Sequence, residues 1–242
     1  MISLPKAKYQ LVADEIRQRI IKQVYPAKTL IPDQNALAKE FKVSRMTVKK
    51  ALDGLAREGL IYKRSGLGTY VLGNIPLKAA NDSPADAFNG LTKQQGAKRV
   101  SSDVIQFDVT FPTADIQEKL HLDANEPVYE ILRLRRLEGS PFILEHTFMP
   151  VTLVPNLSQA ILKKSIYDYI HQSLHLKFGG AYRKIHAALP TKNDIKYLQA
   201  AHNEPILEVE QIVWLNTGEN IEYSTSRNLF NKRSYTILDI NE

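Results

Sequence analysis

The chain contains no cysteine, which excludes disulfides, thiolate nucleophiles and cysteine-ligated metals. It also has no uninterrupted apolar run near the roughly 18 residues of a membrane-spanning helix, and its first residues lack the apolar core of a secretory signal. We therefore expect a cytoplasmic protein without a membrane partner. Its 242 residues, 43% hydrophobic and 24% charged, suffice for one small and one medium-sized globular domain.

Excess positive charge is confined to the first third of the chain. Residues 1–72 contain 14 Lys and Arg against 6 Asp and Glu, a net charge of +8, whereas residues 73–242 contain 18 against 20, a net of −2. A domain that neutralises phosphates, followed by a domain with another task, produces this asymmetry. A basic face that is merely solvated produces it as well, so charge alone leaves both interpretations open.

Three helices are predicted in this basic region. Apolar residues recur at helical spacing over residues 8–23, just before a Tyr-Pro pair that stops the helix. Asp33 is a good N-cap for a short second helix that reaches Phe41. A third helix follows over Ser44–Glu58, with Ser44 as its N-cap and Gly59 at its C-terminal end.

The third helix has one apolar and one polar face. At about 100° per residue, the positions that share an inward arc are Val48, Ala51, Leu52 and Leu55. The outward positions are Arg45, Met46, Thr47, Lys49, Lys50 and Asp53. Two short helices joined by a tight turn, the second with basic and hydroxyl side chains in its first turns, match a helix that enters the DNA major groove.

A hairpin is predicted directly after the third helix. The β-prone runs 60–64 and 69–72 enclose the turn Ser65-Gly66-Leu67-Gly68. Its tip has little side-chain bulk, so the backbone can approach a phosphate or the minor groove, with Arg64 beside it. A nucleotide-binding loop is excluded because no helix follows Gly68 to receive a phosphate.

This region resembles the winged helix-turn-helix domain of GntR-family transcription regulators over residues 8–72. The resemblance is carried by Pro32, Leu37-Ala38, Val43 to Leu52, Leu55, Glu58 to Ile61 and Gly66 to Val71. In that family, the residues matching Arg45, Thr47, Lys49 and Gly66 contact DNA. Many members carry Glu-Arg where this chain has Gln34-Asn35, so we expect an altered operator preference. The predicted DNA-contacting residues are Asn35, Ser44, Arg45, Thr47, Lys49, Lys50, Arg64 and Gly66.

Residues 73–86 contain two prolines and no strong periodicity, which predicts a linker. Beyond it we expect strands at 104–109, 127–137, 142–149, 184–189, 206–216 and 219–229, and helices at 113–120, 156–162, 165–174 and 192–200. Long antiparallel hairpins with intervening helices are typical of an α+β domain built on an antiparallel sheet. The predicted domains are therefore 1–72 for DNA binding and 87–242 for a second task.

Two arginines in the second domain are candidates for anion binding. Strand alternation places Arg133 and Arg135 on the same face of one strand, and two guanidinium groups there suit a phosphate or carboxylate. Glu145 follows the turn and can lie nearby on the return strand. The pattern favours the alternative, a cross-strand salt bridge on a solvated face, over a binding site.

The second domain resembles UTRA, the effector-binding and dimerisation domain of the HutC subgroup of GntR regulators, over residues 87–240. The motifs are Arg133-x-Arg135, Pro141-x-x-x-Glu145, Ser165-Ile166-Tyr167 and Gly218-x-x-x-Glu222-Tyr223-Ser224. In members that respond to sugar phosphates, the matching residues hold the phosphate and the sugar hydroxyls. The resemblance thus implies a phosphate site at Thr92, Arg133, Arg135, Ser165 and Tyr167, and hydroxyl acceptors at Glu145 and Glu222. Gly90-Leu91 and Asn228 depart from the pattern of amino-sugar-phosphate sensors.

We therefore predict a homodimeric repressor of a sugar-utilisation operon that binds a palindromic double-stranded DNA operator and is released by a phosphorylated sugar. The alternatives are an effector-independent architectural DNA-binding protein and, since the UTRA fold resembles that of chorismate lyase, an enzyme. His171 and His175 have the spacing of a helical zinc pair, but no third ligand is apparent. We expect no catalytic residue, metal or cofactor.

Overall fold

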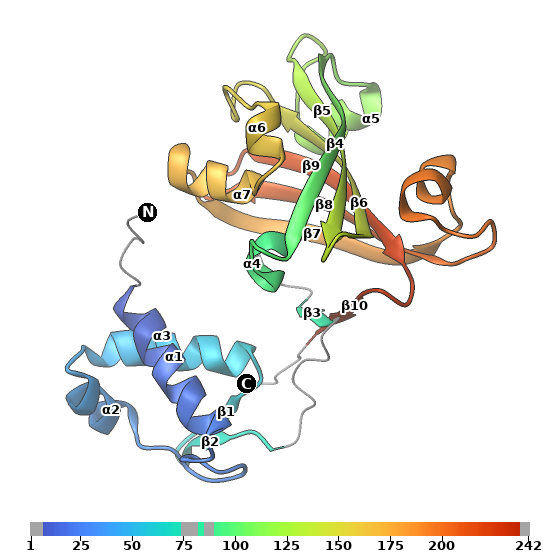
Figure 1. Ribbon diagram of the computed structural model, residues 1–242. Helices are drawn as coiled ribbons and strands as arrows, with labels where there is room; N and C mark the ends of the chain where they lie inside the picture. Colours follow the sequence, from blue (N-terminus) through green and yellow to red (C-terminus); the bar gives the residue numbers. More distant parts are fainter. Residues whose placement is uncertain (1–6, 74–81, 85–89, 238–242) are drawn as a thin grey trace. The chain divides into compact units, whose positions relative to one another are not determined.

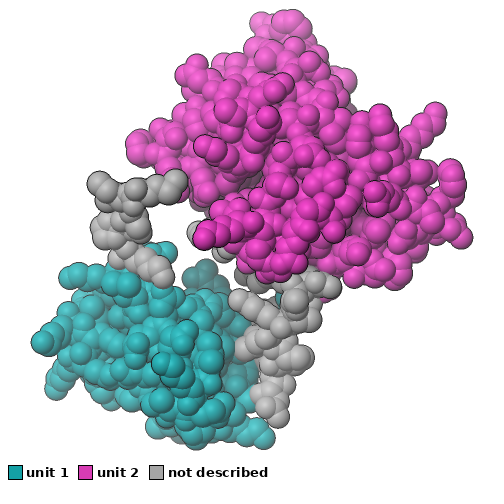
Figure 2. All heavy atoms as spheres, viewed as in Figure 1, with its two compact units in different colours: residues 1–80, 236–242 teal, residues 81–235 magenta. Residues whose placement is uncertain are grey.

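The computed structural model describes residues 7–73, 82–84 and 90–237. Contacts divide the chain into two compact units, residues 1–80 with 236–242, and residues 81–235. Figure 2 distinguishes the two units by colour. The first unit contains the predicted helix-turn-helix and the second contains a large sheet (Figure 1). The described residues include no helix long and apolar enough to cross a membrane.

The first unit begins with three helices, α1 (Lys8–Ile21), α2 (Gln34–Phe41) and α3 (Arg45–Arg57). The predicted caps are in place: the side chain of Asp33 accepts from the amides of residues 35 and 36, and that of Ser44 accepts from the amide of residue 47. Each cap satisfies amide groups that have no partner within the helix. The predicted inward face of α3 is buried, and its residues are Val48, Ala51, Leu52 and Leu55.

The wing is an antiparallel hairpin of β1 (Ile61–Arg64) and β2 (Gly68–Val71). Gly66 and Gly68 have φ angles of +71° and +109°, a region that side chains with a Cβ rarely adopt. A Cβ on Gly68 would also lie 2.7 Å from Cδ1 of Leu30. The segment before α2 pairs with β2 through a bridge between Leu30 and Tyr70, which attaches the wing to the helices.

The second unit is built on a six-stranded antiparallel sheet in the order β4-β5-β6-β9-β8-β7. Its strands are β4 (Val100–Thr110), β5 (Val128–Leu137), β6 (Ser140–Pro150), β7 (Phe178–Ala188), β8 (Ile206–Leu215) and β9 (Asn220–Leu229). The predicted hairpins β5–β6 and β8–β9 are both present. Together the two units confirm the predicted α+β fold, a winged helix-turn-helix followed by a sheet domain.

Short helical segments flank the sheet. On one side, α6 (Gln159–Leu162), α7 (Ile166–Asp168) and the π-helix η1 (Tyr169–Ser173) pack against apolar strand residues such as Ile131 and Val213. Residues from α5 (Ala114–Leu120) pack with Val128 and Tyr223, and the π-helix η2 (Asp194–Leu198) contributes Leu198 to a cluster with Leu132. Beside the first of these groups lies α4 (Leu91–Gln95).

Several predicted boundaries were wrong for identifiable reasons. Strand β7 begins at Phe178 rather than at 184, because the strand also includes Gly179 and Gly180. A Cβ on Gly180 would collide with the ring of Trp214 on β8. The predicted linker contains a short strand, β3 (Asp82–Pro84), which pairs with β10 (Ser234–Thr236). Most of the remaining predicted linker lies outside the described residues.

Candidate functional site

The outward face of α3 presents a basic surface, as predicted. Arg45, Lys49 and Lys50 are exposed, and Met46 between them is 68% exposed. Thr47 is half-buried, and its hydroxyl lies 2.9 Å from that of Ser44, the capping residue. On the wing, Arg64 and Gly66 are exposed. A large exposed apolar side chain among cations is suited to the thymine methyl groups and phosphates of a major groove.

Two of the predicted DNA-contacting residues are held by neighbouring helices. The Nε of Arg45 donates a hydrogen bond of 3.1 Å to Oε1 of Gln34 at the start of α2. The ammonium of Lys50 lies 4.2 Å from the ring centroid of Tyr9 on α1, a cation–π contact. Asn35, next to Gln34, is exposed. Gln34 therefore orients the guanidinium of Arg45, and Lys50 is drawn toward α1.

A pocket in the second unit brings together all seven residues predicted to bind an effector. The cavity volume is about 100 Å³. The seven predicted residues that line it are Thr92, Arg133, Arg135, Glu145, Ser165, Tyr167 and Glu222. The floor is formed by alternate residues of β5, β6, β9 and β8, which point to the same side of the sheet. Residues of α4 and of the start of α7 complete the wall.

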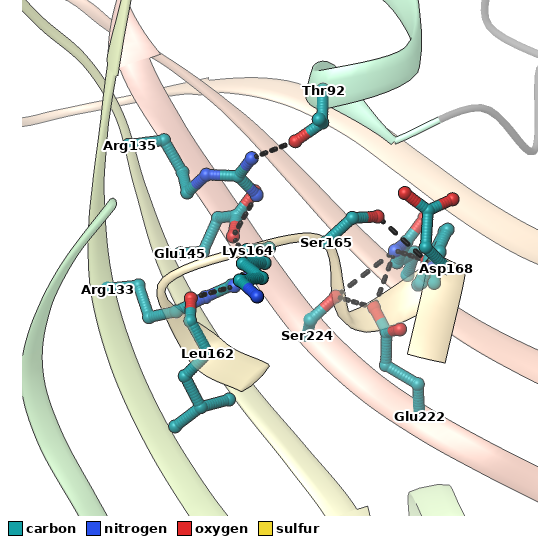
Figure 3. Close-up of polar contacts among 12 residues, drawn as sticks. Thr92, Arg133, Arg135, Glu145, Leu162, Lys164, Ser165, Asp168, Glu222 and Ser224 are labelled. Carbon is teal, nitrogen blue, oxygen red and sulfur yellow. Dashed lines mark hydrogen bonds and ion pairs between the residues drawn. The ribbon is translucent and has the colours of Figure 1, made fainter. Parts of the chain in front are cut away.

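At one end of the pocket, two arginines share one carboxylate (Figure 3). Arg133 and Glu145 are register partners on β5 and β6, and their side chains form an ion pair of 2.6 Å. Arg135 lies 3.5 Å from the same oxygen and donates a bond of 2.7 Å to Oγ1 of Thr92. Arg133 also donates to the backbone carbonyl of Leu162 at 2.9 Å. Both guanidiniums are therefore fixed by the protein.

This cluster is buried, which corrects the expectation of a solvated salt bridge. Arg133 and Arg135 are each 4% exposed, and among the described residues the Nε atoms of both have no hydrogen-bond partner. Burial alone would raise the pKa of Glu145, but the two arginines outweigh burial and hold that pKa below its ordinary value. Glu145 is thus the ionised counter-ion of two buried cations.

At the other end of the pocket, polar groups surround Glu222. The amide of Gln211 donates to Oε1 of Glu222 at 2.7 Å, and the hydroxyl of Ser224 donates to the same atom at 2.6 Å. Gln211 also donates to the hydroxyl of Tyr167 at 3.1 Å. Burial raises the pKa of Glu222 despite these hydrogen bonds, and burial also raises the pKa of Tyr167. Glu222 therefore binds a proton more readily than Glu145 does.

The polar lining residues that sequence reasoning missed include Arg183, Gln211, Arg233 and Tyr235. Arg183 on β7 donates to Oε1 of Gln211 on β8 at 3.0 Å, and the two are register partners. Strand alternation was the available signal for this pair, but β7 was predicted to begin one residue after Arg183. No periodic pattern marks Arg233 or Tyr235, which follow β9 of the six-stranded sheet.

The structure also places the suggested histidine pair and the two positions that depart from the family pattern, Gly90 and Asn228. His171 and His175 do not share a regular helix, because η1 ends at Ser173 and His175 has a φ of +57°. In the described ranges, no group of three or more potential ligands is arranged to hold a metal ion. Gly90 lines the pocket beside the ring of Tyr167, whereas Asn228 is fully buried and does not line it.

Comparison with known proteins agrees with both halves of the chain. The family model described as bacterial regulatory proteins, gntR family, matches residues 8–71, and that of the UTRA domain matches residues 95–232. The HTH-type transcriptional regulator GmuR of Bacillus subtilis (strain 168) is 41% identical over 96% of this chain and 98% of its own. The mannosyl-D-glycerate transport/metabolism system repressor MngR of Escherichia coli (strain K12) is 28% identical over 95% of this chain and 94% of its own.

The fold of this chain is also similar to that of a solved structure. The crystal structure of the possible transcriptional regulator YydK from Bacillus subtilis subsp. subtilis str. 168 matches with a TM-score of 0.78 and 26% identity, covering 97% of this chain and 100% of that one. Together the two family matches cover most of the described helices and strands, and neither is to an enzyme family. The chain belongs to the GntR family, in the subgroup that carries a UTRA domain, and is a DNA-binding transcription regulator.

Proposed function

We propose that this regulator is a repressor that leaves its operator when a phosphorylated sugar binds in the pocket of the UTRA domain. The observation that carries the proposal is the pocket itself, in which buried guanidiniums and buried carboxylates face one another. Guanidiniums and hydroxyls suit a phosphate dianion, and carboxylates suit the hydroxyl groups of a sugar. MngR, by its name, represses genes for a sugar derivative, which is consistent with this chemistry.

Within the pocket, the cationic and hydroxyl groups would bind one part of the effector and the carboxylates another. Arg133, Arg135 and the hydroxyl of Thr92 would hold the phosphate, with Ser165 and Tyr167 beside them. Glu145 and Glu222 would accept hydrogen bonds from sugar hydroxyls. Because the cavity holds only about 100 Å³, below the roughly 300 Å³ at which small-molecule pockets usually begin, the wall formed by α4 and α7 has to open for a sugar phosphate.

We further propose that the protein acts as a homodimer in the cytoplasm, where the chromosome is accessible. Two winged domains would read the half-sites of a palindromic operator through α3 and the wing. An effector that favours a dimer geometry with the wrong half-site spacing would release the DNA. By thermodynamic linkage, operator DNA must then weaken effector binding by the same factor.

A binding experiment tests this proposal directly. An operator would be selected from random DNA, and its affinity measured with glucose 6-phosphate, mannose 6-phosphate, glucosamine 6-phosphate, cellobiose 6′-phosphate and trehalose 6-phosphate, each beside its unphosphorylated sugar. We expect at least one phosphorylated compound to weaken DNA binding and its parent sugar to have no effect. If none changes the affinity, the architectural alternative replaces this proposal, and turnover of any compound would support the enzyme alternative.

Variants locate the response in the pocket. Arg133→Ala should bind the operator but no longer respond to the compound that releases the wild-type protein. Because this change also removes the closer of the two arginines that pair with Glu145, Thr92→Val provides a second test that removes a hydroxyl without altering charge. Arg136→Ala is the matched control: it lies on the same strand but pairs with Asp103 and does not line the pocket. An inducible Arg133→Ala protein would contradict the phosphate assignment.

A further inference from the structure

The last strand of the described residues, β10, contributes to the pocket and pairs with β3 near the start of the second unit. Strand β10 pairs with β3 in a separate two-stranded sheet (Figure 1). Tyr235 lies within β10 and Arg233 immediately precedes it, and both side chains line the pocket. In sequence, β3 is the first described segment after the DNA-binding unit. One short strand pair therefore includes both a wall of the pocket and the beginning of the effector domain.

The side chain of Arg233 is oriented by contacts within the pocket wall. Its guanidinium carbon lies 4.6 Å from the ring centroid of Tyr235, a cation–π arrangement. Its Nη2 donates a long hydrogen bond of 3.3 Å to Oε1 of Gln94 on α4. Arg233 thus spans from the C-terminal strand to the helix that forms another wall of the pocket.

The electrostatic surroundings of Arg233 favour an incoming anion. The charge of Glu145 stabilises the guanidinium cation of Arg233, whereas the charge of Arg183 repels it. Four guanidiniums line the pocket, those of Arg133, Arg135, Arg183 and Arg233, against the carboxylates of Glu145 and Glu222. Among the described lining residues, the cations exceed the anions by two even with both carboxylates ionised. A phosphate dianion would balance this excess.

We infer that Arg233 contacts the anionic group of the effector, stacked on Tyr235, and that this contact makes the β3–β10 strand pair sensitive to occupancy of the pocket. The inference rests on the proposed effector site and adds two residues to it. An anion that recruits the guanidinium of Arg233 replaces or redirects its long bond to Gln94 and fixes the backbone of β10. The ladder between β10 and β3 then carries that ordering to the end of the connection to the DNA-binding unit.

The first measurement uses inorganic phosphate as the probe, titrated into the full-length protein by calorimetry. Arg233→Gln keeps hydrogen-bonding capacity but removes the charge, and loss of a charge-assisted hydrogen bond should weaken phosphate binding roughly ten- to a hundredfold. Lys232→Gln is the matched control, since it removes the same charge from an exposed neighbour outside the pocket lining. Unchanged phosphate affinity in Arg233→Gln, or no phosphate binding by the wild-type protein, would overturn the contact.

The second measurement follows amide hydrogen exchange at Asp82 and Ser83 of β3 and at residues 234–236 of β10, since Pro84 has no amide hydrogen. Phosphate should slow exchange there in the wild-type protein and in Lys232→Gln, but not in Arg233→Gln or, at the same fractional occupancy, in Tyr235→Ala. Unaltered exchange in the phosphate-bound wild-type protein would refute the strand-pair coupling. These results do not depend on DNA release, so the proposed repressor mechanism can fail in the operator experiment while the Arg233 contact survives, and the reverse is equally observable.

Discussion

Arg133 and Glu145 face each other directly on neighbouring strands and form a buried ion pair of 2.6 Å. The same carboxylate also lies against Arg135, so one negative charge compensates two buried cations. Removing that charge leaves both guanidiniums without a counter-ion, which is more costly than the ion pair itself is stabilising.

We therefore predict that Glu145→Gln lowers the free energy of unfolding by about 3–5 kcal/mol, measured by urea denaturation. Glu138→Gln serves as the control, because Glu138 pairs with Arg99 in an exposed salt bridge that is expected to contribute less than about 1 kcal/mol. Equal effects of the two substitutions would show that the buried cluster is not held together by Glu145.

Arg45→Ala should abolish specific operator binding while leaving phosphate affinity in the pocket unchanged. Loss of one base-reading arginine costs about 1–3 kcal/mol per half-site, and a dimer loses two. The measurement is a fluorescence anisotropy titration with selected operator DNA. Arg57→Ala removes the same charge from the C-terminal end of α3 and should retain specific binding; an equal loss in both proteins would mean that Arg45 only adds to the general positive field.

Asn35→Arg should strengthen DNA binding and change operator preference. Asn35 is exposed beside Gln34, the residue that holds Arg45, and many GntR relatives have arginine at this position. If the new guanidinium reaches a phosphate, the slope of log affinity against log salt should steepen by about one unit. Repeating the operator selection with the variant checks preference separately. An unchanged salt slope and an unchanged selected sequence would remove this position from the DNA-contacting set.

Glu222 should make stability depend on pH in a definite direction. An unfolded glutamate titrates near its ordinary pKa of 4.5, whereas burial raises the pKa of Glu222 in the folded protein. Between those two values the folded chain binds more protons than the unfolded chain, so the contribution of Glu222 to stability is lost as the pH rises through this window.

Glu222→Gln removes that titration. The free energy of unfolding of the wild-type protein, minus that of the variant, should therefore fall as the pH rises above 4.5, measured by urea denaturation across a pH series. The pKa of Glu145 is lowered, so its contribution to folding stability is lost only at more acidic pH. Its titration therefore does not overlap with that of Glu222. A difference that is independent of pH, or that rises with pH, would contradict the assignment.

Local patterns in the sequence were sufficient to predict the DNA-binding unit. The caps at Asp33 and Ser44, the inward face of α3 and the turn around Gly66 depend on residues close together in the chain. Strand alternation likewise placed Arg133 and Arg135 on one face. It did not predict their burial, because the wall above them is formed by α4 and α7, some 30 to 40 residues away in sequence on either side.

The remaining errors concern interactions between distant segments. The first residues of β7 were not predicted because glycine is not a β-prone residue, and the space that Gly180 needs arises from Trp214 on another strand. The contribution of Arg233 to the pocket depends on β10 pairing with β3, about 150 residues earlier in the chain. Short pairings of this kind leave no periodicity to detect. Resemblance to a family supplied the phosphate-site hypothesis, but it did not predict Arg183, Arg233 or Tyr235.

The small volume of the pocket also has a consequence for timing. If the proposed sugar phosphate binds in this cavity of about 100 Å³, part of the wall has to move to admit it, and a similar movement would accompany its release. Under that proposal, the rate of wall opening would limit both association and release of the effector. If wall opening is slow, the regulator would not respond to brief rises in effector concentration. It would also remain dissociated from its operator for some time after the effector concentration falls.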